Sequence, residues 1–219
     1  MSWSPARSCV GVEVIENETY CNKRLAARLV VNVYNFSMRK VILGAAITLD
    51  GLIARPDGSV DYLVMTKEGA ALMARFFATI DTIVMGRKTL DVAIALSGGS
   101  YKSPMKAPTY VFSRSQPPGE REGVIFTNQS PRAWLTKIRA RRGKHIWHMG
   151  GGELARSFLE ADLIDELFLG VVPILLGAGL PLFPAGFPQR DFTLVENITY
   201  SKSQISLTYR RVRSKRKRK

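Results

Sequence analysis

The chain has 219 residues, of which 46% are hydrophobic and 23% charged, a composition typical of a globular protein that buries a full core. No uncharged apolar stretch reaches the ~18 residues that a membrane-spanning helix needs, so we expect no membrane partner. With only two cysteines, a reducing, cytoplasmic setting is the default expectation. The formal net charge is +14, and eight of the cations fall in the last ten residues. We therefore expect a mildly basic body, which suits an anionic ligand, followed by a basic disordered tail at residues 213–219.

Residues 1–37 contain both cysteines, Cys9 and Cys21, and show neither a convincing strand nor a secretory signal pattern. Two cysteines and two histidines without any cluster predict no disulfide framework and no metal site. Two interpretations of this stretch stay open. It is either an N-terminal extension before a folded unit that begins at Met38, or a part of the folded protein.

The middle of the chain alternates short apolar runs with helical patterns. A buried strand is predicted at residues 39–48, followed by turns at 49–51 and 56–59 around a short strand at 52–54. Thr66 is suited to cap a helix, whose apolar stripe comprises Leu72, Met73, Phe76, Phe77 and Ile80. Further strands are predicted at residues 81–85, 109–112 and 124–127, and Ser130 with Pro131 marks the start of another helix.

A second strand–helix–strand pattern occupies residues 144–183. An apolar run ends in three glycines, Leu154, Ala155, Phe158 and Leu159 then recur at helical spacing, and a second apolar run spans residues 167–176. Beyond Asp191, strands at 192–196 and 205–212 follow each other without a helix between them. This order predicts an α/β fold: a mainly parallel sheet with helices on both faces, closed by antiparallel C-terminal strands.

The glycines Gly150, Gly151 and Gly152 lie between a predicted strand and a predicted helix. A glycine turn lets a ligand approach the backbone, and the following helix N-terminus offers free N–H groups and the positive end of a dipole. The pattern predicts an anionic ligand at Gly150–Leu154, most simply a dinucleotide pyrophosphate. The alternative is a tight turn without a ligand.

Two other strand ends carry basic and hydroxyl side chains. Gly86 is followed by Arg87, Lys88 and Thr89, and the strand at 109–112 is followed by Ser113 and Arg114. Arginine and lysine bind phosphate, and Thr89 is suited either to cap a helix or to donate to a phosphate oxygen. Because ligands of open α/β sheets bind outside the carboxyl ends of the strands, we expect these ends to share one ligand.

Several other residues could take part in proton transfer or substrate binding, but a structural role is also open for each. Asp50 lies in a Leu-Asp-Gly turn, where it serves either the turn or proton transfer. Tyr62 is either a platform for a flat substrate or an aromatic residue at the edge of the core. His145 and His148 lie on opposite faces of one predicted strand, so they cannot act as a pair, and a structural role is favoured for each.

Five segments in order resemble the dihydrofolate-reductase-like superfamily. These are residues 41–54 (VILGAAITLDGLIA), 85–89 (MGRKT), 150–154 (GGGEL), 163–167 (LIDEL) and 173–183 (PILLGAGLPLF). They are most similar to the C-terminal reductase domain of the bifunctional riboflavin-biosynthesis deaminase–reductase, in a stand-alone form that covers about residues 38–212. The resemblance implies a three-layer sandwich with a mostly parallel sheet and antiparallel C-terminal strands.

The resemblance also implies NADPH as hydride donor and a homodimer. In this family pattern, the nicotinamide of the cofactor would lie beside Ala45 and Ala46. Its pyrophosphate would lie against Gly150, Gly151, Gly152, Glu153 and Leu154. The phosphate contacts would come from Gly86, Arg87, Lys88 and Thr89, with Ser113 and Arg114 near the adenosine 2′-phosphate. The pocket for a small-molecule substrate would be bordered by Asp50, Ser59, Tyr62 and Met149.

The sequence departs from the family pattern at two places. Met149 stands where the riboflavin-type reductase usually carries a glutamate, and the first predicted helix offers only Glu68 as a carboxylate. Met149 weakens the expectation of a 5-amino-6-(5-phosphoribosylamino)uracil reductase-like activity. The lack of a carboxylate other than Glu68 on the first helix weakens the expectation of folate reduction. We expect an NADPH-dependent oxidoreductase acting on a small heterocyclic substrate.

Two other classes of function remain as alternatives. The chain could be a nucleic-acid-associated protein that binds through its basic tail, although the tail has no aromatic side chain for base stacking and a solubilising role is favoured. It could also be a nucleotide-binding protein without catalytic activity.

Overall fold

The computed structural model describes residues 38–201 and 203–213. The predictions made for residues 1–37, including Cys9 and Cys21, and for the tail residues 214–219 lie outside the described residues. No helix in the described part of the chain is long and apolar enough to cross a lipid bilayer.

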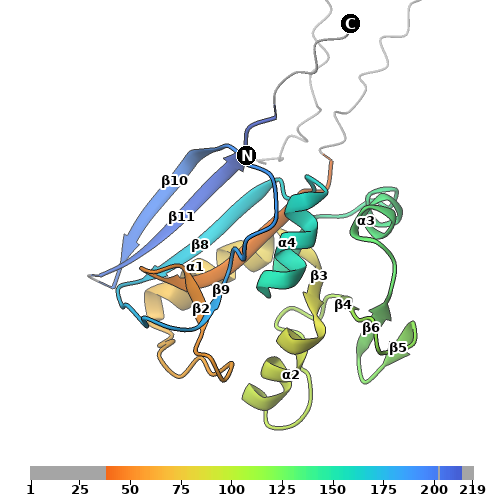
Figure 1. Ribbon diagram of the computed structural model, residues 1–219, viewed down its shortest axis with the longest axis horizontal. Coiled ribbons are helices and arrows are strands. Elements are labelled where there is room, and N and C mark those ends of the chain that lie inside the picture. The colour runs from red at the N-terminus through yellow and green to blue at the C-terminus, as the bar shows by residue number, and fades with distance from the viewer. Residues whose placement is uncertain (1–37, 202, 214–219) are drawn as a thin grey trace, which may run out of the picture. The chain divides into compact units, whose positions relative to one another are not determined.

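A nine-stranded sheet forms the centre of the fold, in the order β10-β11-β8-β1-β7-β3-β4-β6-β5 (Figure 1). The six middle strands run parallel to one another: β8 (Glu166–Val172), β1 (Val41–Thr48), β7 (His145–Met149), β3 (Ile80–Gly86), β4 (Thr109–Phe112) and β6 (Val124–Thr127). The outer strands are antiparallel: β5 (Gly119–Arg121) at one edge, and β11 (Gln204–Arg211) with β10 (Phe192–Tyr200) at the other. The predicted fold class is therefore confirmed.

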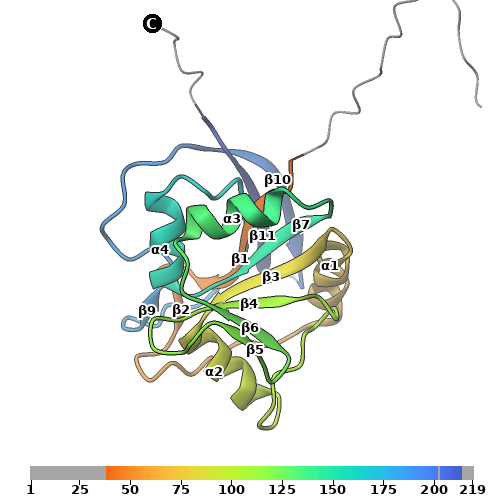
Figure 2. The same ribbon diagram turned by 90° about the vertical axis from the view of Figure 1, so that its right-hand side faces the viewer.

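Helices cover both faces of this sheet. Leucine and aromatic side chains of α3 (Pro131–Arg139) and α4 (Gly152–Glu160) pack on one face around Leu43 and Ile146. On the other face, α1 (Lys67–Ala78) and α2 (Arg87–Leu96) pack around Ile83 and Trp147. Figure 2 shows α3 and α4 next to each other, with strands between them and α2. This arrangement confirms the predicted three layers.

The predicted helix caps are present. Thr66 accepts a hydrogen bond from the Gly69 backbone N–H at 3.1 Å, and Ser130 accepts one from Ala133 at 3.3 Å, with Pro131 in the first turn. Each hydroxyl satisfies a backbone donor that the helix itself leaves free. Ile80, which we expected on the stripe of the first helix, is instead the first residue of β3.

Three sequence expectations need correction. Helix α2 begins at Arg87 with Gly86 as its N-cap, so Thr89 lies inside the first turn and caps nothing. Strand β5 was not expected, because its three residues are all exposed and carry no apolar pattern. Arg213, which we assigned to the disordered tail, forms an ion pair with Asp165 at 2.7 Å.

A small second sheet joins two loops that are far apart in sequence. Strand β2 (Leu52–Ala54) pairs antiparallel with β9 (Leu180–Pro181). Leu49 N–H donates to the Ile174 carbonyl at 2.9 Å. The loop that follows β1 and the loop that follows β8 are therefore held together beyond the carboxyl ends of the sheet.

Candidate cofactor and substrate site

The predicted strand-end residues share one edge of the sheet. Strands β1, β7, β3 and β4 are consecutive and parallel, so their carboxyl ends lie side by side. Asp50, Gly150 and Ser113 follow the ends of β1, β7 and β4, and Gly86 is the last residue of β3. The tertiary structure thus brings together residues that are up to 100 positions apart in sequence.

Two of these ends are in direct contact. Gly151 has a φ of 83°, a conformation that favours glycine, and a Cβ built on it would lie 2.7 Å from the Thr89 hydroxyl oxygen. A Cβ on Gly86 would lie 3.9 Å from the Leu154 Cβ. The turn from β3 to α2 and the turn from β7 to α4 therefore form one continuous surface, and a side chain at Gly151 would occupy it.

Both helices that start from these turns present open N-termini. The N-cap residues, Gly86 for α2 and Gly151 for α4, have no side chain and form no side-chain cap. The first backbone N–H groups of each helix are consequently left for a ligand or for water. Two adjacent helix N-termini place two positive dipole ends at one point, which favours an anion such as phosphate.

The three cations of this edge differ in their availability. Arg87 forms an ion pair with Asp91 at 2.7 Å, one turn further along α2. Lys88 and Arg114 are exposed, and neither side chain forms a hydrogen bond or ion pair with another residue in the described ranges. Lys88 and Arg114 are therefore better placed than Arg87 to bind an added anion.

Ser113 has a structural task at the end of β4. Its hydroxyl accepts hydrogen bonds from the backbone N–H groups of Gln116 at 3.0 Å and Ser115 at 3.3 Å, and its side chain is buried. These bonds shape the turn that carries Arg114. The geometry therefore favours an indirect contribution of Ser113, which positions its neighbour.

Small residues line the last half of the central strand β1. Ala45 and Ala46 are partly buried and pair with Leu169 and Gly170 of β8. A Cβ on Gly170 would approach the Ala46 Cα to 3.9 Å. This stretch presents little side-chain bulk, and Ala46 and Gly170 lie on the same face of the sheet.

Asp50 holds two loops together. One carboxylate oxygen accepts from the backbone N–H groups of Leu176 at 3.1 Å and Gly177 at 2.8 Å, and the other from the Thr48 hydroxyl. The hydrogen bonds from Thr48 and Gly177 lower the pKa of this carboxyl. A carboxyl group kept ionised is a poor proton donor near neutral pH, so the geometry favours the turn interpretation over catalysis.

Tyr62 and Ser59 lie in the loop between β2 and α1. The Tyr62 hydroxyl is buried without a hydrogen-bond partner among the described residues, and burial raises its pKa. The Arg55 guanidinium lies 5.8 Å from the centre of the Tyr62 ring and pairs with Asp61. Ser59 is part of a turn in which its backbone N–H donates to Asp57 at 2.8 Å.

The residues around the glycine turn are largely committed to packing. Met149 is partly buried against the core that contains Trp147, and Glu153 forms an ion pair with Arg156 at 2.9 Å. His148 is fully buried, with its ring edge-on to Phe158, and burial lowers its pKa to about 4. His148 is therefore neutral above acidic pH and, as expected, does not pair with His145.

Exposed apolar side chains gather in the two linked loops, and the sequence analysis missed them as a group. Leu49, Val64 and Met65 lie in the first loop, and Leu175 lies in the second, each more than half exposed. The sequence places Leu49 in a predicted turn and Leu175 in a predicted apolar run, and it assigns no role to Val64 and Met65. The β2–β9 pairing and the Asp50 bonds hold the two loops together, and we call these four exposed side chains the apolar rim.

The comparisons with known proteins define the family. The model of the RibD C-terminal domain matches residues 39–205, so the chain belongs to the RibD C-terminal domain family. It is also similar to the uncharacterised protein YwjB of Bacillus subtilis (strain 168), with 38% identity over 66% of this chain and 83% of the relative.

Solved structures show the same fold. A protein of Shewanella sp. PV-4, provisionally assigned to riboflavin biosynthesis, is 30% identical over 80% of this chain and 99% of its own, with a TM-score of 0.66. A dihydrofolate reductase of Enterococcus faecalis, solved with NADP(H), is 19% identical over 78% of this chain and 96% of its own, with a TM-score of 0.56. The fold is thus that of the dihydrofolate-reductase-like and RibD-like reductases.

Proposed function

We propose that this protein is an NADPH-dependent reductase that delivers hydride to a C=O or C=N group of a small heterocyclic substrate. The observation that carries the proposal is the contact between two glycine turns, at Gly86 and Gly151, where two helix N-termini open onto one edge of the sheet. Such an edge suits the two phosphates of a dinucleotide. Membership in a reductase family supports the same conclusion.

The residues at this edge fit NADPH. The backbone N–H groups of Gly151, Gly152 and the first turn of α2 would hold the diphosphate, with Thr89 beside them. Arg114 and Lys88, which have no partner among the described residues, would bind the 2′-phosphate. When bound, NADPH supplies the hydride, and the small side chains of Ala45 and Ala46 leave space for its nicotinamide ring.

The apolar rim would receive the substrate. Leu49, Leu175 and Met65 would exclude water from the reacting atoms, and the Tyr62 hydroxyl offers an unused donor in the same loop. A substrate related to 5-amino-6-(5-phosphoribosylamino)uracil fits the family. The thioether of Met149, where that reductase usually has a carboxylate, favours a less polar heterocycle.

The cofactor part is tested by following NADPH fluorescence while the full-length protein is added. We expect saturable binding, and Gly151→Ala should weaken it about tenfold or more, or ~1.4 kcal/mol, because the new methyl group meets the Thr89 hydroxyl. Gly98→Ala is the matched control, since Gly98 also has a positive φ but nothing lies within 4 Å of its Cβ position. Absence of NADPH binding up to millimolar concentration would refute the proposal.

The 2′-phosphate assignment has its own test. Arg114→Gln should reduce the preference for NADPH over NADH about tenfold, as expected for the loss of a charge-assisted contact worth ~1.4 kcal/mol. Arg87→Gln should change this preference less, because Asp91 already engages Arg87. An unchanged ratio in Arg114→Gln would remove Arg114 from this role.

We also propose a homodimer, as the family resemblance implies. Strand β10 is an edge strand of nine residues, and its Leu194 and Val195 side chains are about half exposed. Exposed apolar residues on an unpaired edge are suited to a second copy. Light scattering coupled to gel filtration should give twice the chain mass, and Leu194→Lys should give the monomer; a monomeric wild type refutes the homodimer.

A further inference from the structure

A basic cluster lies at the opposite, amino-terminal edge of the parallel strands. It is built from the segment before β1, the end of α3 with the segment that follows it, and the end of β11. We call it the basic edge and define it by Arg39, Lys40, Lys137, Arg139, Arg141, Arg142, Lys144, Arg210, Arg211 and Arg213. It shares no residue with the proposed cofactor site.

Hydrogen bonds hold the three segments of the basic edge together. Arg39 donates to the carbonyl of Lys144 at 2.8 Å and to that of Ile138 at 3.2 Å, and Arg139 donates to the carbonyl of Arg39 at 2.9 Å. Asp165 accepts from both Arg139 and Arg213. The cluster is therefore a fixed feature of the fold and does not depend on flexible side chains meeting by chance.

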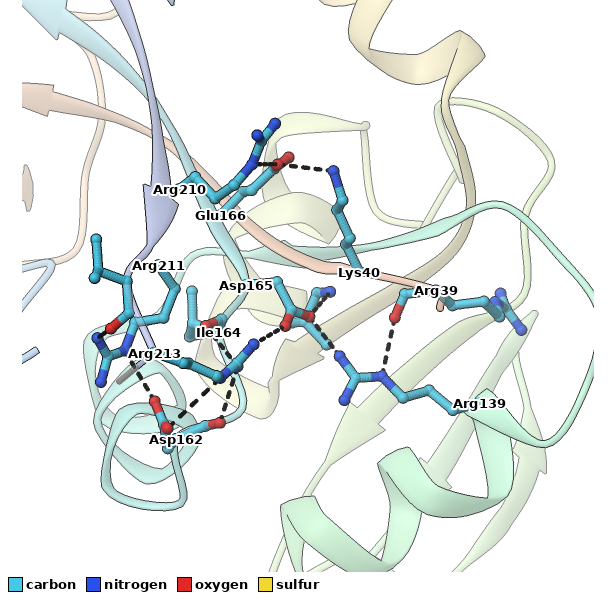
Figure 3. A network of polar contacts seen from close by, with 12 residues as sticks. Arg39, Lys40, Arg139, Asp162, Ile164, Asp165, Glu166, Arg210, Arg211 and Arg213 are labelled. Atoms are coloured by element: carbon cyan, nitrogen blue, oxygen red, sulfur yellow. Dashed lines mark hydrogen bonds and ion pairs between the residues drawn. The ribbon is translucent and has the colours of Figure 1, made fainter. Parts of the chain in front are cut away.

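The carboxylates of this edge are already engaged by cations. Arg210 and Lys40 approach Glu166 from two sides, at 3.0 and 2.8 Å (Figure 3). Burial alone would raise the pKa of Glu166, but the hydrogen bonds from Lys40 and Arg210 lower it. Asp162 pairs with Arg211 at 3.0 Å, and Arg39 pairs with Asp81. Together with Asp165, these three acids make four carboxylates against the ten cations of the basic edge.

Most of the net positive charge of the described residues lies at the basic edge. The basic edge has ten cations against four carboxylates, Asp81, Asp162, Asp165 and Glu166. The rest of the described chain has twelve cations against eleven carboxylates. An excess of six charges thus lies at one edge, and the remainder of the described protein is almost neutral.

The outer cations of the basic edge are accessible. The side chains of Arg210 and Arg213 are 57% and 42% exposed. Lys137 and Arg141 are exposed, and their side chains form no hydrogen bond or ion pair within residues 38–201 and 203–213. A cleft of about 260 Å³ opens at this edge, lined by Lys40, Asp165, Glu166, Arg210, Arg211, Arg213 and Met38.

We propose that the basic edge binds the phosphate backbone of nucleic acid, without reading its sequence. Seven of its ten cations are arginines, whose planar guanidinium binds phosphate oxygens in pairs. The sequence continues beyond Arg213 with five further cations at Lys215–Lys219. No aromatic side chain belongs to the cluster, so contacts with phosphates dominate over base stacking.

Arginine content distinguishes nucleic acid from an anionic membrane as the partner. Attraction to a charged lipid surface depends on the number of charges and is similar for lysine and arginine. A single polybasic patch also needs a second anchor for stable membrane attachment. The exposed guanidinium groups of Arg210 and Arg213, at and just after the end of β11, suit discrete phosphodiester groups better.

The experiment uses the full-length protein and fluorescently labelled short single-stranded and duplex DNA, with anisotropy measured over a range of salt concentrations. We expect binding that weakens steeply with salt. The variant Lys137→Gln, Arg141→Gln, Arg210→Gln should bind duplex DNA about tenfold more weakly at low salt, with a salt slope smaller by about two to three. NADPH binding should stay unchanged, which separates this inference from the proposed reductase function.

A matched variant controls for net charge. Lys67→Gln, Lys102→Gln, Lys106→Gln removes three exposed lysines outside the basic edge and should bind DNA like the wild type. If the first variant does not fold, Lys137→Gln with Arg141→Gln alone replaces it, because neither side chain has a described partner. Equal losses in both variants would refute a localised site.

Two further results would overturn the proposal. Wild-type protein that binds no DNA at low salt excludes a nucleic-acid partner. Binding to vesicles of phosphatidylcholine and phosphatidylglycerol but not to DNA would assign the edge to a membrane surface instead. Deletion of residues 214–219 should weaken DNA binding without abolishing it, and complete loss would show that the tail alone carries it.

Discussion

At the scale of single residues, glycine decides the shape of the proposed cofactor site. Gly151 combines a positive φ with a Cβ position only 2.7 Å from the Thr89 hydroxyl. A side chain there would both strain the backbone and fill the surface that the two turns share. By contrast, the charged residues of the site differ in their freedom: Arg87 is paired with Asp91, and Arg114 is not paired with any described residue.

His148 carries an electrostatic cost in the core when it is protonated. Its ring is fully buried beside Phe158, and neither ring nitrogen has a hydrogen-bond partner among the described residues. Burial penalises the charged form and lowers the pKa from 6.5 to about 4. The neutral His148 side chain therefore fits the core at neutral pH, whereas protonation in acid destabilises the folded protein.

This cost predicts a pH-dependent stability. As pH falls below 6.5 the unfolded chain takes up the His148 proton first, so stability declines until the folded protein is protonated near pH 4. Between pH 7 and pH 5 we expect His148 to account for a loss of about 2 kcal/mol. In urea unfolding curves, the unfolding free energy of His148→Leu should therefore fall by about 2 kcal/mol less than that of the wild type between pH 7 and pH 5. Equal pH dependence in both proteins would contradict the assignment.

At the scale of elements, ion pairs fix the end of β11 to the start of β1 and β8. The Asp165 carboxylate accepts from the Val41 backbone N–H at 2.8 Å, from Arg139 and from Arg213. Its side chain is only 9% exposed. One carboxylate therefore joins α3 and three strands of the sheet, and it holds the Arg213 side chain against them.

Removal of this carboxylate should be costly. Asp165→Ala leaves two guanidinium groups and one backbone N–H without their acceptor, and we expect a loss of ~3 kcal/mol of unfolding free energy. Asp61→Ala is the control, because its ion pair with Arg55 is largely exposed and should contribute little. Urea unfolding at neutral pH measures both. Similar small effects in the two variants would show that Asp165 does not hold these elements together.

At the scale of the whole molecule, the two edges of the parallel sheet carry different chemistry. The carboxyl edge has open helix N-termini and an apolar rim, and the amino edge holds most of the excess positive charge. This separation is a consequence of parallel strands, whose equivalent ends all face the same way. It allows a cofactor and a polyanion to bind without competing for the same residues.

The folded unit should be independent of the first 37 residues. The RibD C-terminal domain match begins at residue 39 and β1 begins at Val41. A protein that starts at Met38 should therefore unfold at the same temperature as the full chain and bind NADPH equally well. Circular dichroism and fluorescence titration test both expectations, and a lower unfolding temperature would show that residues 1–37 contribute to the fold.

Much of the fold could be predicted because its signals are local. Strands β4 and β6 have the predicted bounds, and the caps Thr66 and Ser130 are where the sequence placed them. Apolar periodicity and capping depend on residues within a few positions of each other. The start of helix α2 was misplaced at Thr89, because its true N-cap, Gly86, has no side chain that marks the first residue of the helix.

The sequence by itself determined the class of fold and indicated which glycine and basic residues form the proposed cofactor site. Both follow from short segments, because turns and strand ends are recognised from a few consecutive residues. Only the tertiary structure decided that Gly151 meets Thr89, that Asp50 holds two loops, and that ten cations gather at one edge. Each of these depends on which strands become neighbours. That choice is made by the packing of the whole core and cannot be read from any single segment.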